Sequence, residues 1–207
     1  MPFETAESEF TEKRSRFIGQ VWRVTGEEEA RARIAETKKK YYDARHNCWC
    51  YLLNEGGVLR CSDDGEPQGT AGQPMLEVFR REGVVDVCCV VTRYFGGVLL
   101  GAGGLTRAYA KSAKDALNAA GVCRMRLWNR WTVPCTYPLL ERVKGEAETL
   151  SGRVETIDYG ETPTLRILLP QEAEEPFGAY LTELSAGRLA MQKAGTAVLP
   201  GPREEAK

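Results

Sequence analysis

The sequence predicts an α+β protein built from two domains, and three observations carry this prediction. The chain has 207 residues, enough for one large domain or two small ones. Short apolar, strand-like runs alternate with segments of helical spacing. The second half has the order βαββαβ, which is the ferredoxin-like pattern. We therefore expect domains over residues 1–130 and 131–200, followed by a flexible tail at 201–207.

The first domain is expected to begin with a strand and a helix. Residues 17–24 alternate apolar and polar side chains, as a strand with one buried face does. Thr25 then precedes three glutamates, which predicts a helix N-cap followed by acids that suit the helix dipole, with the helix ending near Tyr41. The aromatic and cysteine-rich segment 47–53 predicts a buried strand, and a turn joins it to a hairpin partner at 58–61.

A short helix, a central strand and a longer helix follow. Residues 74–79 have helical spacing. Residues 85–92 are nearly all apolar, which predicts a central strand buried on both faces. Apolar side chains recur at helical spacing over 105–120 until Gly121 ends the helix, and a strand is expected over 124–133.

The second domain is expected to start near residues 130–134, where the pattern begins a new βαββαβ series. Its expected elements are strand 131–136, helix 138–150, strands 153–159 and 162–169, helix 171–184 and strand 189–199.

Composition places the chain among cytoplasmic proteins. Its hydrophobic fraction of 43% and charged fraction of 28% are ordinary for a globular protein. No apolar run approaches about 18 residues, so no membrane span is predicted. The acidic N-terminus lacks the apolar core of a signal peptide. The seven cysteines are odd in number and several lie in apolar runs, which predicts free, buried thiols in a reducing compartment.

The net charge of −1 argues against a nucleic-acid-binding protein whose whole surface is positive. This value leaves room for a local basic face. The candidate cations for such a face are Arg14, Arg16, Lys38, Lys39 and Lys40. A solvated helix face is the plainer interpretation of the lysine run.

An acidic turn contains Asp63, Asp64 and Glu66, and Thr70 follows in a glycine-bounded run. Three carboxylates so close in sequence could bind Mg²⁺ with the help of a phosphate. Asp-Gly and Glu-Pro are also ordinary turn dipeptides, and turn chemistry is the interpretation we prefer for Asp64.

A second glycine-rich segment precedes the long helix. Arg93 can grip a carboxylate or phosphate with two hydrogen bonds, or it can form a buried ion pair with one of the turn acids. Glycines before a helix can turn backbone N–H groups toward an anion, but they also suit a tight turn or close packing. Phosphate-loop and dinucleotide fingerprints both fail here, because no lysine follows and Thr106 holds the last glycine position. The candidate anion-binding residues are Arg93, Tyr94, Gly97, Gly101, Gly103, Gly104 and Lys111.

Other chemistries find little support. His46 is the only histidine, and its cysteine neighbours lie in apolar contexts that keep a thiol inert. The cysteine spacing does not match a zinc site, and neither Ser62 nor Thr70 has the partners of a hydrolase triad. We predict no cofactor and no metal, and an enzyme is the less favoured class.

These motifs resemble the YigZ/IMPACT family. The residues that carry the resemblance are Ser62-Asp63-Asp64-Gly65-Glu66-Pro67, Gly69-Thr70-Ala71-Gly72 with Pro74-Met75-Leu76, Val90-Val91-Thr92-Arg93-Tyr94-Phe95-Gly96-Gly97, Leu100-Gly101-Ala102-Gly103-Gly104-Leu105 and Arg107-Ala108-Tyr109. The match covers about Ser8 to Gly121. Gln73 stands where members often carry a lysine, so position 73 supplies no positive charge here.

The resemblance implies a first domain of the ribosomal protein S5 domain 2-like fold and a second domain similar to domains of elongation factor G. It also implies a link to translation, because eukaryotic members with the first domain regulate translation during amino-acid starvation by competing for a kinase activator. Some members carry a proline-dipeptidase label, which a chain with one histidine does not support.

Two hypotheses follow. The first is a non-catalytic, translation-linked regulator that contacts RNA, the ribosome or a translation-related protein; fold analogy alone is a weak warrant for it. The alternative is a small-molecule or phosphate-binding enzyme that uses Asp63, Asp64 and Glu66 together with Arg93 and the turn at 101–104. The sequence does not reveal the oligomeric state.

Overall fold

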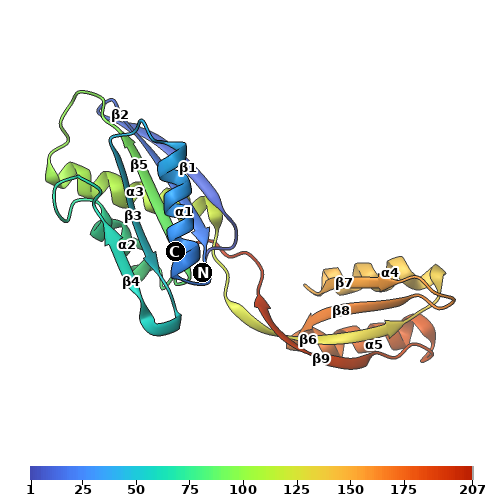
Figure 1. Cartoon of the computed structure of the whole chain (residues 1–207). Coiled ribbons are helices and arrows are strands. Elements are labelled where there is room, and N and C mark those ends of the chain that lie inside the picture. The colour runs from blue at the N-terminus through green and yellow to red at the C-terminus, as the bar shows by residue number, and fades with distance from the viewer. Residues whose placement is uncertain (207) are drawn as a thin grey trace. The chain divides into compact units, whose positions relative to one another are not determined.

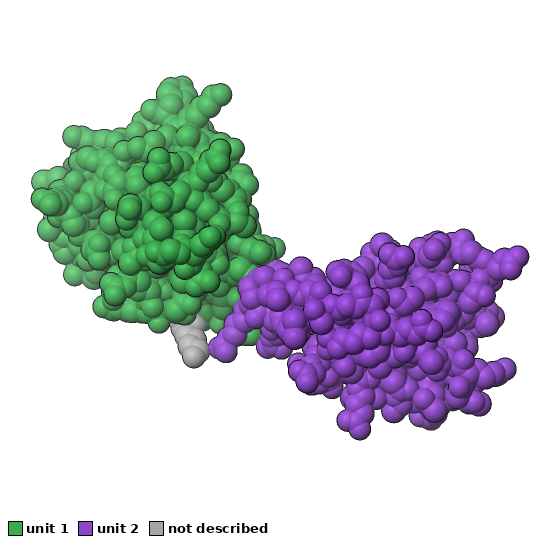
Figure 2. Space-filling view, turned by 60° about the horizontal axis from the view of Figure 1, so that its bottom comes forward, with its two compact units in different colours: residues 1–123, 203–207 green, residues 124–202 purple. Residues whose placement is uncertain are grey.

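The computed structural model describes residues 1–206, and these form two compact units. Unit 1 consists of Met1–Cys123 together with the described residues that follow Pro202, and unit 2 is Arg124–Pro202 (Figure 2). The boundary therefore lies earlier than residue 130. The reason is that the segment interpreted from the sequence as two successive strands is one continuous strand of unit 2, β6 (Met125–Pro134).

Unit 1 is built on a five-stranded antiparallel sheet in the order β1-β2-β5-β3-β4 (Figure 1). Its strands are β1 (Ala6–Glu12), β2 (Ser15–Arg23), β3 (His46–Leu52), β4 (Leu59–Ser62) and β5 (Val87–Tyr94). The predicted central strand is confirmed, because β5 lies in the middle of the sheet and is buried from Val87 to Arg93. A strand covered on both faces needs this nearly continuous apolar run.

Strand β1 is the element that the sequence pattern does not reveal. It pairs only with β2 at the edge of the sheet. Its main apolar contact is Phe10, which stacks on Phe17 with ring centroids 5.2 Å apart. An edge strand that buries part of one face needs few apolar residues, so its alternation is weak.

Helices cover both faces of this sheet (Figure 1). Helix α1 (Glu27–Lys40) packs on one face through Ala30 and Ile34. Helices α2 (Gly72–Arg81) and α3 (Ala102–Ala120) pack on the other face over the larger apolar cluster. Helix α3 approaches β2 so closely that a Cβ at Gly19 would lie 2.6 Å from the Ser112 carbonyl oxygen. Only glycine fits at that contact.

The start of α1 differs in detail from the predicted cap. Gly26, in an extended conformation, occupies the N-cap position and makes no side-chain cap bond. Thr25 instead donates to Oε2 of Glu29 through both its backbone nitrogen, at 2.8 Å, and its hydroxyl, at 3.0 Å. The glutamate thus reaches back as in one half of a capping box. In the turn after β3 there is a short 3-10 helix, η1 (Glu55–Gly57).

Unit 2 has the predicted βαββαβ order. Its elements are β6, α4 (Tyr137–Thr149), β7 (Arg153–Asp158), β8 (Thr164–Pro170), the 3-10 helix η2 (Gln171–Ala173), α5 (Glu174–Ser185) and β9 (Gln192–Pro200). The antiparallel sheet runs β7-β8-β6-β9, and both helices contribute to one apolar cluster with it. The α+β class with a ferredoxin-like second domain is confirmed.

The sequence predicts a flexible tail over 201–207, but its described part pairs with other backbone segments, and residue 207 lies outside the described residues. Val122 forms antiparallel bridges with Pro2 and with Glu204, so three chain segments meet there. Arg203 Nη2 also donates to the Ala119 carbonyl oxygen at 2.8 Å. Backbone pairing with unit 1 therefore anchors a segment whose composition alone predicts a loose end.

None of the helices within residues 1–206 combines the length and the apolar character needed to cross a membrane.

Candidate functional site

Asp63 of the acidic turn caps helix α2. Its Oδ1 accepts hydrogen bonds from the backbone nitrogens of Ala71, at 3.0 Å, and Gly72, at 2.8 Å. Its Oδ2 accepts one from the Gly69 nitrogen at 2.7 Å. A carboxylate at a helix N-terminus satisfies unpaired N–H groups and suits the helix dipole. These contacts explain Asp63 through the fold, without a metal or substrate.

Asp64 ties the turn to the sheet and to α1. Its Oδ1 lies 2.5 Å from Lys38 Nζ, and its Oδ2 accepts a hydrogen bond from the Asn47 nitrogen at 2.7 Å. The residue has a φ of 43°, a left-handed turn conformation that aspartate tolerates better than most residues. The turn chemistry preferred for Asp64 is therefore what the structure contains.

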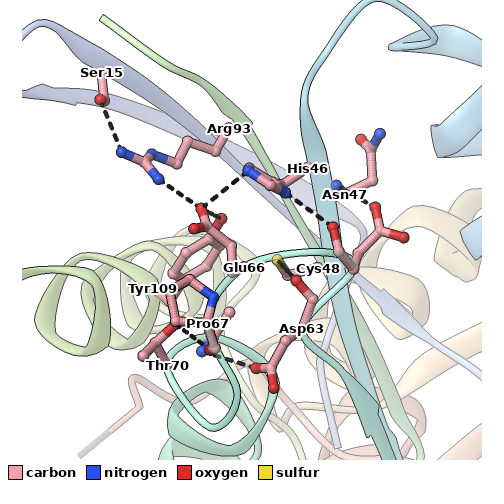
Figure 3. A network of polar contacts seen from close by, with 12 residues as sticks. Ser15, His46, Asn47, Cys48, Asp63, Glu66, Pro67, Thr70, Arg93 and Tyr109 are labelled. Carbon is pink, nitrogen blue, oxygen red and sulfur yellow. Dashed lines mark hydrogen bonds and ion pairs between the residues drawn. The ribbon is translucent and has the colours of Figure 1, made fainter. Parts of the chain in front are cut away.

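Glu66 is the centre of a buried polar network (Figure 3). Its side chain is 3% exposed, and Oε1 accepts hydrogen bonds from Arg93 Nη1 at 2.7 Å and from the Tyr109 hydroxyl at 2.8 Å. His46 Nε2 lies 3.9 Å from the same oxygen. Of the three turn acids it is Glu66 that pairs with Arg93. Burial, reinforced by Cys48 and Glu66, raises the pKa of Tyr109, so its hydroxyl stays a donor.

Arg93 is held on several sides. Its Nη2 donates to Ser15 Oγ at 3.3 Å, and its guanidinium lies 5.5 Å from the Phe17 ring centroid and 5.4 Å from that of Phe95. Its Nε is buried and has no hydrogen-bond partner among the described residues. One donor of the network is thus unsatisfied, whereas the charge itself is neutralised by Glu66.

His46 and Cys48 do not form a nucleophile pair. His46 Nδ1 lies 2.9 Å from the Asp64 carbonyl oxygen, which requires this nitrogen to carry the proton. The Cys48 thiol donates to the Asp63 carbonyl oxygen at 2.9 Å, and burial raises its pKa to about 12. A thiol that stays protonated is a structural donor and not a nucleophile.

A pocket of about 330 Å³ opens beside this network. Glu66, Arg93 and His46 line it together with apolar residues of the β5–α3 loop, including Leu99 and Leu100. Gly101, with a φ of 73°, turns the chain into α3, and the Leu105 nitrogen closes the first helical turn onto its carbonyl oxygen. The positive φ explains the glycine at this position without a ligand.

The structure brings Glu66, Arg93 and Gly101 together at this pocket. The other predicted site residues lie elsewhere. Tyr94 donates to Asp43 Oδ1 at 2.7 Å, and Thr70 Oγ1 donates to the Pro67 carbonyl oxygen at 2.7 Å. Lys111 pairs with Asp115 and, with Gly104, borders a different pocket. Gly97 is exposed with a φ of 84°, and Gly103 is exposed in the first turn of α3.

The sequence does not identify three members of the buried network around Glu66 and Arg93, namely Ser15, His46 and Tyr109. His46 draws notice only as the single histidine, and Tyr109 only as an apolar position of a predicted helix. Only the tyrosine carries a further indication, because its hydroxyl needs a hydrogen-bond partner when it is buried. The sequence does not identify that partner, since Glu66 is 43 positions away.

Most predicted surface cations have acidic partners. Arg16 forms two hydrogen bonds with Glu9, at 2.8 and 2.7 Å, and Lys40 lies 3.4 Å from Glu7. Lys38 is bound to Asp64 as described, Lys39 is exposed on α1, and Arg14 lies in the β1–β2 turn. These residues therefore do not form an uninterrupted basic face.

Within the described part of the chain, no group of three or more His, Cys, Asp or Glu side chains is placed to hold a metal ion. The interpretation of the acidic turn as a Mg²⁺ site stays a hypothesis, because Mg²⁺ can bind through one or two carboxylates and a phosphate. The carboxylates of Asp63, Asp64 and Glu66 point to a helix end, a lysine and an arginine respectively.

Comparison with known proteins shows which families the chain is similar to. The Impact N-terminal domain model matches residues 13–117, and a domain of unknown function, DUF1949, matches residues 133–188. IMPACT family member YvyE of Bacillus subtilis is 39% identical over 186 residues, covering 89% of this chain and 86% of YvyE. For YigZ of Escherichia coli the identity is 36% over 180 residues, covering 86% and 88%.

Two solved structures are similar to the chain. The crystal structure of a hypothetical protein is 34% identical, covers 92% of this chain and 94% of its own, and has a TM-score of 0.58. The structure of Yih1, described as a two-domain translational regulator, is 25% identical over 58% of this chain and 46% of its own. Its TM-score of 0.34 is too low to indicate a shared overall arrangement.

Proposed function

The chain belongs to the IMPACT family, and we propose that it is a non-catalytic binding protein linked to translation. Its partner is RNA, the ribosome or a translation factor, and the surface we favour for contact is the β5–α3 loop with its pocket. One observation supports this choice most strongly, which is the exposure of apolar side chains on the loop. Phe95 is 40% exposed, Val98 39% and Leu99 82%.

The link to translation rests on the family. Yih1 is described as a translational regulator, and the resemblance noted above implies the same role for eukaryotic members. The Impact N-terminal domain match falls within unit 1, which also holds the loop and the pocket. We therefore place the regulatory contact on unit 1.

The side chains of the buried network beside the pocket favour binding over catalysis. Glu66 is neutralised by Arg93, and Tyr109 and Cys48 keep their protons at neutral pH because burial raises their pKa values. A general base or nucleophile needs a pKa near the working pH and access to the substrate. Tyr109 and Cys48 lack the first property.

An apolar loop exposed to water fits a partner protein better than a nucleic acid. Contiguous exposed apolar side chains commonly mark contact sites. The surface cations predicted for RNA contact are largely paired with acids, so a phosphate backbone would have to displace these partners. An apolar side chain of a translation factor or ribosomal protein can enter the pocket of about 330 Å³ at no such cost.

Sedimentation of the full chain with purified ribosomes and translation factors tests this proposal. We expect co-sedimentation that persists from about 50 to 500 mM salt, because apolar contacts are little screened whereas phosphate contacts weaken steeply. Leu99→Ser should reduce the bound fraction about tenfold. The matched control is Leu127→Ser, since Leu127 is an exposed leucine, 56% accessible, in unit 2.

Equal binding by Leu99→Ser and the wild type would remove the loop from the proposal. Absence of binding to every ribosomal and factor fraction would remove the link to translation.

A small ligand of the pocket is the second candidate function. The observation that favours it is the buried Arg93 Nε, a donor without a hydrogen-bond partner among the described residues beside the pocket. Thermal-shift measurements with nucleotides and phosphorylated metabolites, with and without Mg²⁺, test this candidate. A ligand at a hundredfold excess over its Kd adds about 2.7 kcal/mol to the free energy of unfolding. A flat response across the panel would eliminate the candidate.

A further inference from the structure

A second surface of unit 1 lies on the α1 face of the sheet. A groove of about 440 Å³ is bordered there by α1 and by residues of β3 and the edge strand β4. We propose that this groove binds single-stranded nucleic acid, with a base stacked on Trp49 and phosphates held by cations around it. The β5–α3 loop contributes no residue to the groove, so this inference concerns a second surface, separate from the loop contact proposed above.

The floor of the groove is aromatic. Trp49 and Tyr51 lie two positions apart on β3, so their side chains project from the same face of the sheet. Their rings are stacked, with centroids 5.7 Å apart and planes 8° apart. Tyr51 is 2% exposed and its hydroxyl donates to Glu27 Oε2 at 2.8 Å, so it is fixed as a backing for the indole.

Trp49 is the accessible member of this pair, since its side chain is only partly buried. Ile34 and Ala35 of α1 form an apolar wall beside it. A fixed indole next to an apolar wall offers a base a stacking surface that is already ordered. Base–aromatic stacking is worth about 1–3 kcal/mol per base and tolerates any sequence.

Cations surround the floor, and none of the described residues that line the groove is an Asp or a Glu. Arg31 and Lys38 come from α1, and Arg60 comes from β4 opposite Tyr51. Arg31 and Lys38 are paired with Glu27 and Asp64, so a phosphate would have to share or displace these acids, although the two side chains remain 73% and 41% exposed. Arg60 Nη1 donates to the Leu59 carbonyl oxygen at 2.9 Å, and Arg60 makes no ion pair among the described residues. Arg60 is therefore the cation most available to a phosphate.

The same features disfavour an acidic peptide as the occupant. A peptide would gain most by adding a strand to the edge of β4, but this strand has only four residues and offers few hydrogen bonds. A nucleic acid uses both parts of the groove, because each nucleotide carries a planar base and a charged phosphate. The protein's net charge of −1 restricts such binding to a local surface of this kind.

Fluorescence anisotropy of a labelled oligouridine of about 20 nucleotides tests the inference with the full chain at about 50 mM salt. Trp49→Leu should weaken binding about tenfold or more, because the stacking surface is lost. Trp49→Phe keeps an aromatic ring and should recover most of the affinity. Arg60→Gln should weaken binding severalfold and reduce the dependence on salt by about one phosphate contact.

The matched control is Arg81→Gln, which removes an exposed cation from α2, on the other face of the sheet. This variant should bind as the wild type does. Circular dichroism checks that each variant is folded. If Trp49→Leu does not fold, Arg60→Gln still tests the inference.

Four outcomes would overturn the inference. The first two are no binding of the oligonucleotide and equal losses of affinity in Arg60→Gln and Arg81→Gln. The other two are equal affinity for duplex RNA and displacement by a poly-glutamate peptide at a lower concentration than by unlabelled oligouridine. A labelled deoxyuridine strand compares RNA with DNA. Leu99→Ser should leave this binding unchanged, so failure of the loop proposal and failure of the groove proposal are separable.

Discussion

Two arginine–glutamate pairs, one in each unit, have similar contact distances and very different surroundings. Arg93 Nη1 and Glu66 Oε1 are 2.7 Å apart, with side chains 6% and 3% exposed. Arg130 binds both oxygens of Glu155, at 2.6 and 2.8 Å, with side chains 35% and 28% exposed. The surface pair has the better hydrogen-bond geometry. Burial, and not geometry, decides what the loss of one partner costs.

Removing Glu66 is the strongest test of this difference. Glu66→Ala should lower the free energy of unfolding by about 3–5 kcal/mol, because Arg93 would keep a buried charge without a partner. Urea unfolding gives the size of the loss, and hydrogen exchange locates it, since amides of β5 should lose protection while those of unit 2 do not. The double variant Glu66→Leu with Arg93→Met should recover much of the loss. A loss below about 1 kcal/mol for Glu66→Ala would contradict the burial argument.

Asp63 provides an intermediate case, because its three hydrogen bonds go to backbone nitrogens and not to a charge. Asp63→Ala should cost about 1–3 kcal/mol and should expose the amides of α2 to exchange. Asp63→Asn retains one acceptor oxygen and should cost less. If the two variants are equally destabilised, the negative charge matters more than the hydrogen bonds.

The surface pair should show a small effect with a definite pH dependence. The hydrogen bond from Arg130 lowers the pKa of Glu155. A lowered carboxyl pKa in the folded state stabilises the protein above the unfolded-state value and loses this contribution as the pH falls through the folded-state pKa. Arg130→Ala should therefore lower the unfolding midpoint slightly at pH 7. The difference from the wild type should shrink as the pH falls below the ordinary glutamate pKa and Glu155 becomes protonated. A difference that stays constant as the pH is lowered would assign the effect to packing.

Thiol labelling compares the reactivity of buried and exposed cysteines in the native protein, and here we expect no change in stability. Of the seven cysteines, Cys61 is exposed and the other six are buried. In the native protein a thiol reagent should modify Cys61 first, while Cys48, with its pKa raised to about 12, should react only after unfolding. Mass spectrometry of the labelled peptides identifies the order. Early labelling of Cys48 would show that the acidic turn opens in the native state.

The sequence predicts the scaffold better than the network. The apolar run of β5 and the helical spacing of α3 are local patterns, so they are readable one segment at a time. Asp63 caps a helix whose first residue lies nine positions later, whereas local capping rules consider adjacent residues. The sequence allows Arg93 to pair with any of the three acids of the turn, because sequence order does not reveal which of them points into the protein. In the folded chain only the Glu66 side chain is buried beside Arg93.

The pairing of Val122 with both Pro2 and Glu204 sets an order of events during synthesis. Residues 1–123 leave the ribosome before unit 2, and a domain whose residues have all emerged can fold at once. Unit 1 is different, because one of its pairing segments is made only after the whole of unit 2. A nascent unit 1 therefore keeps an unpaired backbone edge at Val122 until residue 204 has been added.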